Sequence, residues 1–326
     1  MRKRMSNLEK NLKIVFMGTP DFAVGALEAL IREGYEITAV VTQPDKPKGR
    51  SKELLPSPAK VCALEHGIPV LQPRRIKAPE AIEELKTYEA DVYVVAAFGQ
   101  ILSQEILDIP RLGSLCIHAS LLPKYRGASP IQHVIIDGGE KTGVTIMQMD
   151  AGIDTGDMLY KKEVPIDSED DYETLSDKLT VLGGEAITEA LPLLMEGKLT
   201  PQKQKDEESC YAAMIRKEMG RIDFAKPAIE IDRLIRGLTP WPSAYTGFKG
   251  KQLKIWKAVP LPEEPVAGHV PGELLRVEKD AVTVATGDGA LKILELQLEG
   301  KKKMTAHDFL LGVKLQPGEV LESVDR

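Results

Sequence analysis

The fold of the N-terminal half is decided by KIVFMGTPDFAVGALEALIREG, residues 13–34. Its apolar run from Ile14 to Met17 is typical of a strand buried in a parallel sheet. Thr19 is expected to cap the helix that follows, with Pro20 in the first helical position, and apolar residues then recur at helical spacing. ITAVVT, residues 37–42, is a second buried strand. A strand, a helix and a strand joined by short turns predict a parallel βαβ unit.

Strands and helices continue to alternate up to residue 195. The helix that begins near Ser168 is expected to open on a capping box with Asp171 and to kink or end at Pro192. The pattern predicts a doubly wound, Rossmann-like α/β domain with a mostly parallel sheet. The expected helices are 58–66, 79–87, one from Ser129 and 168–194, and the expected strands are 68–71, 91–97, 114–118, 143–149 and, at an edge, 158–166.

The composition changes after residue 195. EGKLTPQKQKDEES, residues 196–209, is polar and aperiodic, which indicates a linker. Short alternating runs follow, and VATGDGALKIL predicts a hairpin across residues 287–289, so the C-terminal part is expected to be a small, OB-like β-barrel. The expected organisation is a tail (1–12), an α/β domain (13–195), a linker (196–210) and a barrel (211–326).

Composition excludes several classes of protein. Three scattered cysteines, Cys62, Cys116 and Cys210, give neither a disulfide framework nor a metal-binding spacing, and a reducing cytoplasm suits them. No apolar run reaches about 18 residues, and the basic start MRKRMSNLEKN, in which Met5 is an alternative first residue, lacks the apolar core of a secretory signal.

Nothing in the sequence indicates an oligomerisation element, so a monomer is expected. The first turn, GTPDFAVG, lacks the glycines of a dinucleotide-binding fingerprint, which argues against a nicotinamide dehydrogenase.

Titratable side chains follow two of the expected strands. SLCIH ends on His118, and GVTIMQM runs into MDAGIDTGD with its three aspartates. Ligands of open α/β sheets bind at the carboxyl ends of strands, where an aspartate would orient an imidazole and support its charged form. The residues alone leave a structural role open, because a histidine at a strand end is often structural and Asp and Gly are common in turns.

A set of motifs extends this constellation. GTPDFA, TQPDKPKGR, AAFGQIL, HASLLPKYRGASPIQ, GVTIMQMDAGIDTGDM and GLTPWPSAYT occur in this order and together closely resemble the bacterial methionyl-tRNA formyltransferases, over essentially the whole chain after the tail. The resemblance implies transfer of a formyl group from 10-formyltetrahydrofolate to the amino group of methionyl initiator tRNA, in the cytoplasm and without a metal. Two alternatives are a formyltransferase for another amine, such as a sugar nucleotide, and a catalytically impaired tRNA-binding protein.

The same resemblance assigns the catalytic residues. It places the family's histidine and aspartate at His118 and Asp154, whereas Asp150 and Asp157 shape the loop. The family's asparagine, whose amide donates to the oxyanion of the reaction, is replaced by Cys116. A thiol is a weak donor, and losing one oxyanion donor costs about 3 kcal/mol. Three explanations stay open: a protonated histidine with water suffices, the pocket accommodates the cysteine, or activity is reduced.

Folate and tRNA contacts are also implied by the resemblance. The folate set lies beside the same strand ends, although Ile101 and Leu102 also suit simple core packing. Basic clusters imply salt-dependent contacts with tRNA phosphates, Arg50 being the strongest candidate, although such charge runs are commonly just solvated faces. The expected folate residues are Phe98, Gly99, Gln100, Ile101, Leu102, Ser120, Leu121, Leu122, Pro123 and Asp150, and the expected tRNA residues are Lys46, Lys48, Arg50, Lys52, Arg126, Lys249, Lys251 and Lys254.

Overall fold

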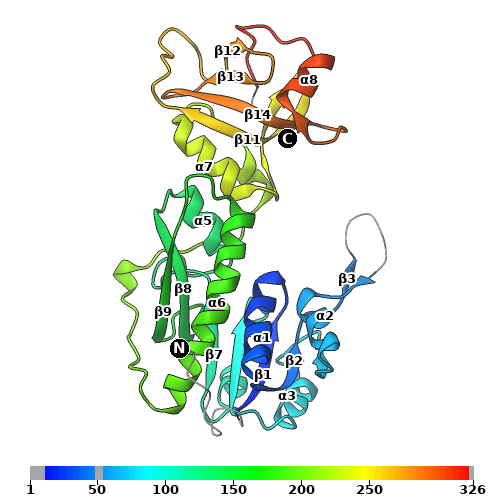
Figure 1. Ribbon diagram of the computed structural model, residues 1–326, viewed down its shortest axis with the longest axis vertical. Coiled ribbons are helices and arrows are strands. Elements are labelled where there is room, and N and C mark those ends of the chain that lie inside the picture. The colour runs from blue at the N-terminus through cyan, green and yellow to red at the C-terminus, as the bar shows by residue number, and fades with distance from the viewer. Residues whose placement is uncertain (1–11, 48–53, 323–326) are drawn as a thin grey trace. The chain divides into compact units, whose positions relative to one another are not determined.

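The computed structural model describes residues 12–47 and 54–322 (Figure 1). By compactness the described residues form two units: the first comprises those up to residue 127 with 141–165 and 176–212, and the second comprises 128–140, 166–175 and 213–322. This division differs from the domains expected from the sequence, 13–195 and 211–326, which stay a prediction. Each unit is described by itself.

The first unit is built on a seven-stranded sheet with the strand order β5-β2-β1-β6-β7-β8-β9. The pairs from β5 to β7 are parallel, and β8 and β9 join antiparallel, with β9 at the edge. The mostly parallel sheet is therefore confirmed. The strands are β1 Lys13–Gly18, β2 Glu36–Val41, β5 Val70–Leu71, β6 Val92–Ala96, β7 Ser114–His118, β8 Lys141–Gln148 and β9 Met158–Pro165.

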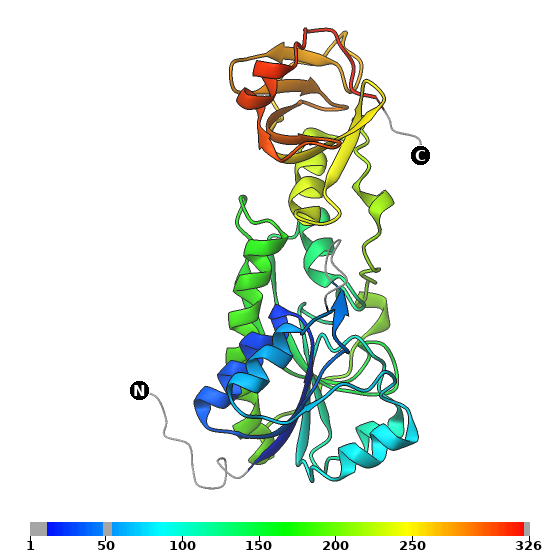
Figure 2. The same ribbon diagram turned by 90° about the vertical axis from the view of Figure 1, so that its right-hand side faces the viewer.

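Helices cover both faces of this sheet (Figures 1 and 2). On one face α1 approaches α6 so closely that a Cβ atom added at Gly25 would lie 2.8 Å from the Thr180 carbonyl oxygen. On the other face Val15 and Met17 of β1 form a core with apolar side chains of α3 and α4. The helices that carry these contacts are α1 Asp21–Glu33, α2 Pro58–Glu65, α3 Pro79–Lys86, α4 Gln104–Leu107 and α6 Tyr172–Met195.

The first turn differs from the expectation. Helix α1 begins at Asp21 after Pro20, and no side chain caps it. The Thr19 hydroxyl instead donates to the Phe98 carbonyl oxygen at 3.0 Å, so it ties the turn after β1 to the segment after β6. The capping role expected for Thr19 is wrong because that hydroxyl is used between strand ends.

The start of α6 also differs. The Asp171 carboxylate accepts from the Thr174 amide at 2.9 Å, and the Thr174 hydroxyl accepts from the Asp171 amide at 3.0 Å, so this pair forms the reciprocal cap that was expected of Ser168 with Asp171. Pro192 lies inside the helix, which continues to Met195. The expected end of the helix at Pro192 is therefore wrong.

The second unit is built on an antiparallel sheet in the order β10-β11-β14-β13-β12, with β15 beside β14. Residues 320 and 322 bridge to Glu273 and Gly247, which links the two edges of the sheet. The hairpin expected across 287–289 is confirmed by the pairing of Ala285 with Ala290. The strands are β10 Ala244–Phe248, β11 Lys251–Leu261, β12 Leu274–Val277, β13 Val282–Ala285, β14 Ala290–Leu298 and β15 Met304–Thr305.

Three helices also belong to this unit: α5 Pro130–Ile136, α7 Ala228–Leu238 and α8 Ala306–Gly312. Ile231 and Ile235 of α7 pack into the same core as Leu253 and Ile255 of β11. Helices α7 and α8 were not expected from the sequence. In the first unit, strands β3 Lys46–Pro47 and β4 Leu54–Leu55 form a separate two-stranded antiparallel sheet.

Candidate active site

Strand topology alone does not bring the two expected catalytic side chains together. Strand β7 ends at His118, and β8 runs antiparallel to it, so that Gln148 at the end of β8 lies opposite Leu115 near the start of β7. The loop 149–157 therefore begins beside the start of β7 and has to run back along that strand. The convergence of Asp154 with His118 depends on how this loop is held.

His118 and Asp154 meet across this loop. His118 Nδ1 lies 3.7 Å from Asp154 Oδ2, and only 7% and 18% of the two side chains are exposed. His118 Nε2 lies 2.9 Å from the Tyr125 carbonyl oxygen. A carbonyl only accepts, so Nε2 carries the proton in the neutral ring and Nδ1 presents its lone pair toward the carboxylate.

The carboxylate is held in place by the main chain of the KYRG turn. The Gly127 amide donates to Asp154 Oδ2 at 2.8 Å. Gly127 has a φ of 111°, and a Cβ atom there would lie 2.7 Å from the Ala212 carbonyl oxygen, so glycine is required at this position. A proton that reaches His118 Nδ1 would create an imidazolium directly beside a fixed negative charge, which is the arrangement of a general base with its supporting carboxylate.

Cys116 lies two residues before His118 on β7, and therefore on the same face of the sheet. Its side chain is buried in a small apolar cluster with Leu122, Met147 and Met158. Burial, with a smaller contribution from the negative charge of Asp154, raises the pKa of the thiol. This upward shift favours the neutral thiol, which is a poor nucleophile.

The aspartates of the loop have separate tasks. The Asp150 carboxylate accepts from the Gly152 amide at 3.0 Å and from the Thr155 hydroxyl at 2.8 Å, so it folds its own loop. A Cβ atom at Gly156 would collide with the carbonyl oxygen of Gln148, which explains the glycine of the DTGD motif. The Asp150 side chain is thus engaged within the loop, whereas folate contact had been expected of it.

Sequence reasoning missed the segment that closes over this loop. Residues 202–212, of which 202–210 were expected to belong to a linker and 211–212 to the barrel, pack within the first unit. Gln204 Nε2 donates to the carbonyl oxygens of Asp154 and Gly156, both at 2.8 Å, and Gln204 Oε1 accepts from Arg126 Nε at 2.9 Å. An aperiodic polar stretch gives no sequence signal for such contacts, because they join a single amide to backbone carbonyls far along the chain.

The same segment occupies Arg126, which had been expected to approach tRNA. Besides Gln204, the guanidinium contacts Asp206, with Nη1 2.9 Å from Oδ1, and only 12% of the Arg126 side chain is exposed. The Arg126 amide and carbonyl pair with residues 210 and 212. The structure gives Arg126 an internal task, and its contact with tRNA stays a prediction.

The expected folate segment after β6 is divided between core and surface. The Phe98 and Leu102 side chains are in the core, and Gln100 bonds the Ile76 amide and the Pro73 carbonyl oxygen. The side chain of Ile101, in contrast, is 59% exposed. Because β6 and β7 are parallel neighbours, this free apolar side chain follows a strand end adjacent to that of His118, which suits an aromatic ligand such as a pterin.

The expected folate turn Ser120–Pro123 is held in place by side chains of β8 and β9. Leu122 donates its amide to the Thr145 hydroxyl at 3.1 Å and accepts from Lys161 Nζ through its carbonyl at 2.6 Å. The Ser120 hydroxyl donates to the Lys124 carbonyl oxygen at 2.6 Å, and the Leu122–Pro123 bond is cis. Burial lowers the pKa of Lys161. These contacts fix the conformation of the turn.

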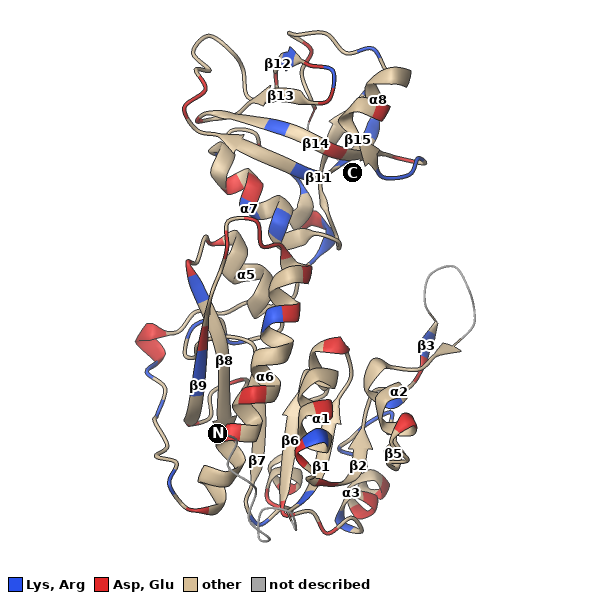
Figure 3. Cartoon of the chain, in the orientation of Figure 1, with Lys and Arg blue, Asp and Glu red and all other residues tan. Residues whose placement is uncertain are grey.

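The expected tRNA residues are only partly described. Lys48, Arg50 and Lys52 lie outside the described residues. Lys46 and Lys251 are exposed, whereas Lys249 Nζ lies 3.5 Å from Glu319 and Lys254 Nζ donates to the Pro242 carbonyl oxygen at 3.1 Å. Figure 3 shows basic residues on β11 and β14, on the sheet of the second unit.

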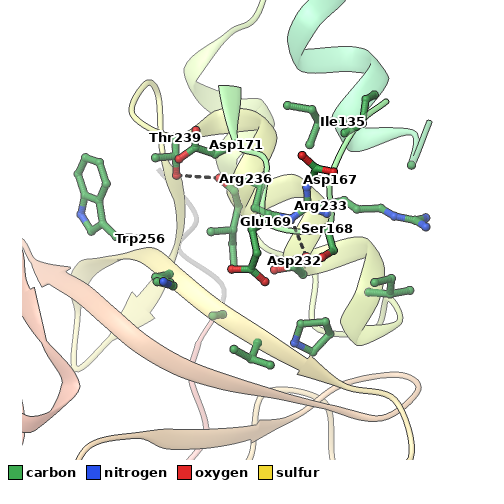
Figure 4. Close-up of a pocket in the computed structure, with 18 of the residues that line it drawn as sticks. Ile135, Asp167, Ser168, Glu169, Asp171, Asp232, Arg233, Arg236, Thr239 and Trp256 are labelled. Carbon is green, nitrogen blue, oxygen red and sulfur yellow. Dashed lines mark hydrogen bonds and ion pairs between the residues drawn. The ribbon is translucent and has the colours of Figure 1, made fainter. Parts of the chain in front are cut away.

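A cavity of about 720 Å³ in the second unit is a separate feature (Figure 4). The segment 167–171 and α7 line it, and Asp232 Oδ2 there accepts from Arg236 Nε at 2.8 Å. Burial raises the pKa of Asp232 although Arg236 opposes this. None of the residues that line this cavity is expected in catalysis or folate binding, and its buried charges are already paired.

Two negative findings concern the part of the chain that the structure describes. Within residues 12–47 and 54–322, no group of three or more His, Cys, Asp or Glu side chains is arranged to hold a metal ion. In the same residues, every helix is too short or too polar to cross a bilayer.

Comparison with known proteins gives a consistent result. A formyl transferase family model matches residues 12–191, and a model of the formyl transferase C-terminal domain matches residues 214–314. The methionyl-tRNA formyltransferase of Geobacter metallireducens is 52% identical over 94% of this chain and 97% of its own, and that of Caldanaerobacter subterraneus is 52% identical over 95% and 100%. HypX from Aquifex aeolicus, solved with tetrahydrofolic acid, has a TM-score of 0.64 at 21% identity over 97% of this chain and 50% of its own.

Proposed function

The chain belongs to the formyl transferase family, in its methionyl-tRNA formyltransferase branch, and we propose that its catalytic centre is the pair His118 and Asp154. Its activity is transfer of the formyl group of 10-formyltetrahydrofolate to the amino group of methionyl initiator tRNA. The observation that supports the site is the 3.7 Å approach of His118 Nδ1 to Asp154 Oδ2. An arrangement that brings these side chains together from a strand end and a returning loop is suited to proton transfer.

The proposed mechanism gives each residue a step. The amino nitrogen forms a bond to the formyl carbon, the bond from that carbon to the folate nitrogen breaks, and one proton has to move from the amine to the departing nitrogen. His118 accepts this proton at Nδ1 and returns it, while its Nε2–H stays bonded to Tyr125. Asp154, held by the Gly127 amide, stabilises the imidazolium in between.

A formylation assay tests this assignment. We expect Asp154→Asn and His118→Asn each to lower kcat about 100-fold or more, because a positioned acid–base group contributes about 10²- to 10⁴-fold. The assay uses 10-formyltetrahydrofolate and charged initiator tRNA, and circular dichroism confirms folding. Lys141→Gln, in an exposed ion pair with Glu163, is the control and should retain wild-type turnover. Wild-type turnover in a folded Asp154→Asn protein would refute the assignment.

We place the folate donor against Ile101 and the turn Ser120–Pro123. The main chain of Phe98–Leu102 is proposed to face the pterin, and the exposed side chain of Ile101 supports this placement. The Leu122 carbonyl, fixed by Lys161, supports the role of the turn Ser120–Pro123. For tRNA, we propose contacts from the basic residues of the β3–β4 region and of the second sheet, namely Lys46, Lys48, Arg50, Lys52, Lys249, Lys251 and Lys254. The protein is proposed to act as a monomer in the cytoplasm, where charged tRNA is used.

A further inference from the structure

Asp154 occupies a backbone conformation that needs support. Its φ is 55°, in the left-handed region that side-chain-bearing residues seldom adopt. The Gly127 amide holds only the carboxylate and Asp150 holds the loop at Gly152 and Thr155, so a further partner has to fix the main-chain carbonyl groups at 154 and 156. Gln204 makes the two hydrogen bonds that do so, to the carbonyl oxygens of Asp154 and Gly156.

The orientation of the Gln204 amide is determined by its neighbours. Two carbonyl oxygens only accept and an arginine only donates, so the NH₂ group has to face the loop and the oxygen has to face Arg126 Nε at 2.9 Å. Asp206 in turn holds Arg126 Nη1 at 2.9 Å. Three side chains thus form one chain of contacts that ends on the backbone of Asp154.

We propose that Gln204 is a positioning residue for formyl transfer, which sets the Asp154 carboxylate against His118 Nδ1, with Arg126 fixing the orientation of the Gln204 amide. The inference rests on the proposed role of the His118–Asp154 pair. Gln204 has no contact with the reacting atoms in this arrangement. It acts through geometry, and a misplacement of about 1 Å in a catalytic group costs about 100-fold in rate.

Two variants separate the parts of this arrangement. Gln204→Glu keeps the size of the side chain and its acceptor for Arg126, but it turns a carboxylate toward two carbonyl oxygens. Gln204→Met keeps the length and removes both functions. We expect both to lower kcat about 10- to 100-fold while KM for the folate and for charged tRNA stays within about twofold. Gln202→Ala, at an exposed residue two positions earlier, is the matched control and should equal the wild type.

A structural readout accompanies the kinetics. Hydrogen exchange of the amides in 150–157 should rise in Gln204→Met, while exchange in β6 and β7 stays unchanged. Unchanged kcat in both variants would overturn the inference, as would an increase in exchange spread over the whole first unit, because that indicates general destabilisation. A rise in KM at constant kcat would also overturn it, in favour of a binding role.

Measuring Asp154→Asn in the same assay keeps the two proposals distinct. If Asp154→Asn loses turnover and the Gln204 variants do not, the inference about Gln204 alone is wrong. If Asp154→Asn retains turnover, the proposed catalytic pair is wrong, and the Gln204 inference falls with it.

Discussion

By the family resemblance, Cys116 is the residue at which this chain departs most clearly from the family's motifs. Its thiol lies in an apolar cluster on the same strand as His118, where the family resemblance places an asparagine. The three explanations for the cysteine stay predictions: a protonated histidine with water suffices, the pocket accommodates the cysteine, or activity is reduced. In enzymes with an oxyanion hole, the loss of one hydrogen-bond donor raises the activation free energy by about 3 kcal/mol.

Replacing Cys116 by asparagine tests that interpretation. We expect Cys116→Asn to keep or raise turnover, by at most about 100-fold, because an amide donor is restored. We also expect the melting temperature to fall, because a buried amide without partners costs about 1–3 kcal/mol. Turnover in the formylation assay and thermal unfolding measure the two effects. A folded but inactive Cys116→Asn protein would show that this position has no oxyanion role.

Functional residues that lie in short sequence motifs could be predicted from the sequence. Residues whose side chains hydrogen-bond to distant backbone groups could not. The approach of His118 to Asp154 was predicted, but the family resemblance, and not the strand ends, selected Asp154 among the three aspartates, since β8 runs antiparallel to β7. Gln204 and Lys161 hold carbonyl oxygens of the site from distant segments. No local pattern marks such residues, because any polar side chain of suitable length can accept or donate to a backbone group.

At the scale of elements, the start of α6 allows a sharp test of a helix cap. The Asp171 carboxylate accepts from the Thr174 amide at 2.9 Å, while Ser168 is exposed three residues earlier. We expect Asp171→Ala to lower the free energy of unfolding by about 1 kcal/mol, since an N-cap side chain typically contributes that much. Ser168→Ala should leave it unchanged. Urea unfolding followed by circular dichroism measures both, and an equal loss in both variants would contradict the assignment of the cap to Asp171.

The helices and strands that were predicted from the sequence differ from those that were missed in the sequence patterns that flank them. The strands β1, β2, β6 and β7 carry continuous apolar runs bounded by turns, so their positions agree with the expectation within a few residues, whereas the short strands β3 and β4 were not expected. Helix α7 was missed although its apolar side chains recur at helical spacing, because it lies among short runs that alternate like strands. Its helical pattern becomes distinct only when Ile231 and Ile235 are seen packed against β11.

At the scale of the molecule, the compact units follow contacts between segments distant in the sequence. Residues 128–140 and 166–175 belong to the second unit although they lie between strands of the first. Helix α5 is drawn there by α7: a Cβ atom at Gly237 would lie 2.7 Å from Ile136 Cγ1. A sequence shows where composition changes, as it does after residue 195, but not which earlier segments pack against the later domain.

Charge distribution, rather than net charge, governs the proposed binding of tRNA to this chain, whose formal net charge is −6. Lys251 is exposed on β11, whereas Lys292 of β14, on the same sheet, has its Nζ 3.1 Å from Glu278. A lysine that contacts a phosphate releases about one counterion on binding, so Lys251→Gln should weaken binding and reduce the slope of log K against log salt by about 1. Lys292→Gln should change neither. Titrations of charged initiator tRNA at several salt concentrations measure both quantities, and equal effects of the two substitutions would place the tRNA elsewhere on the molecule.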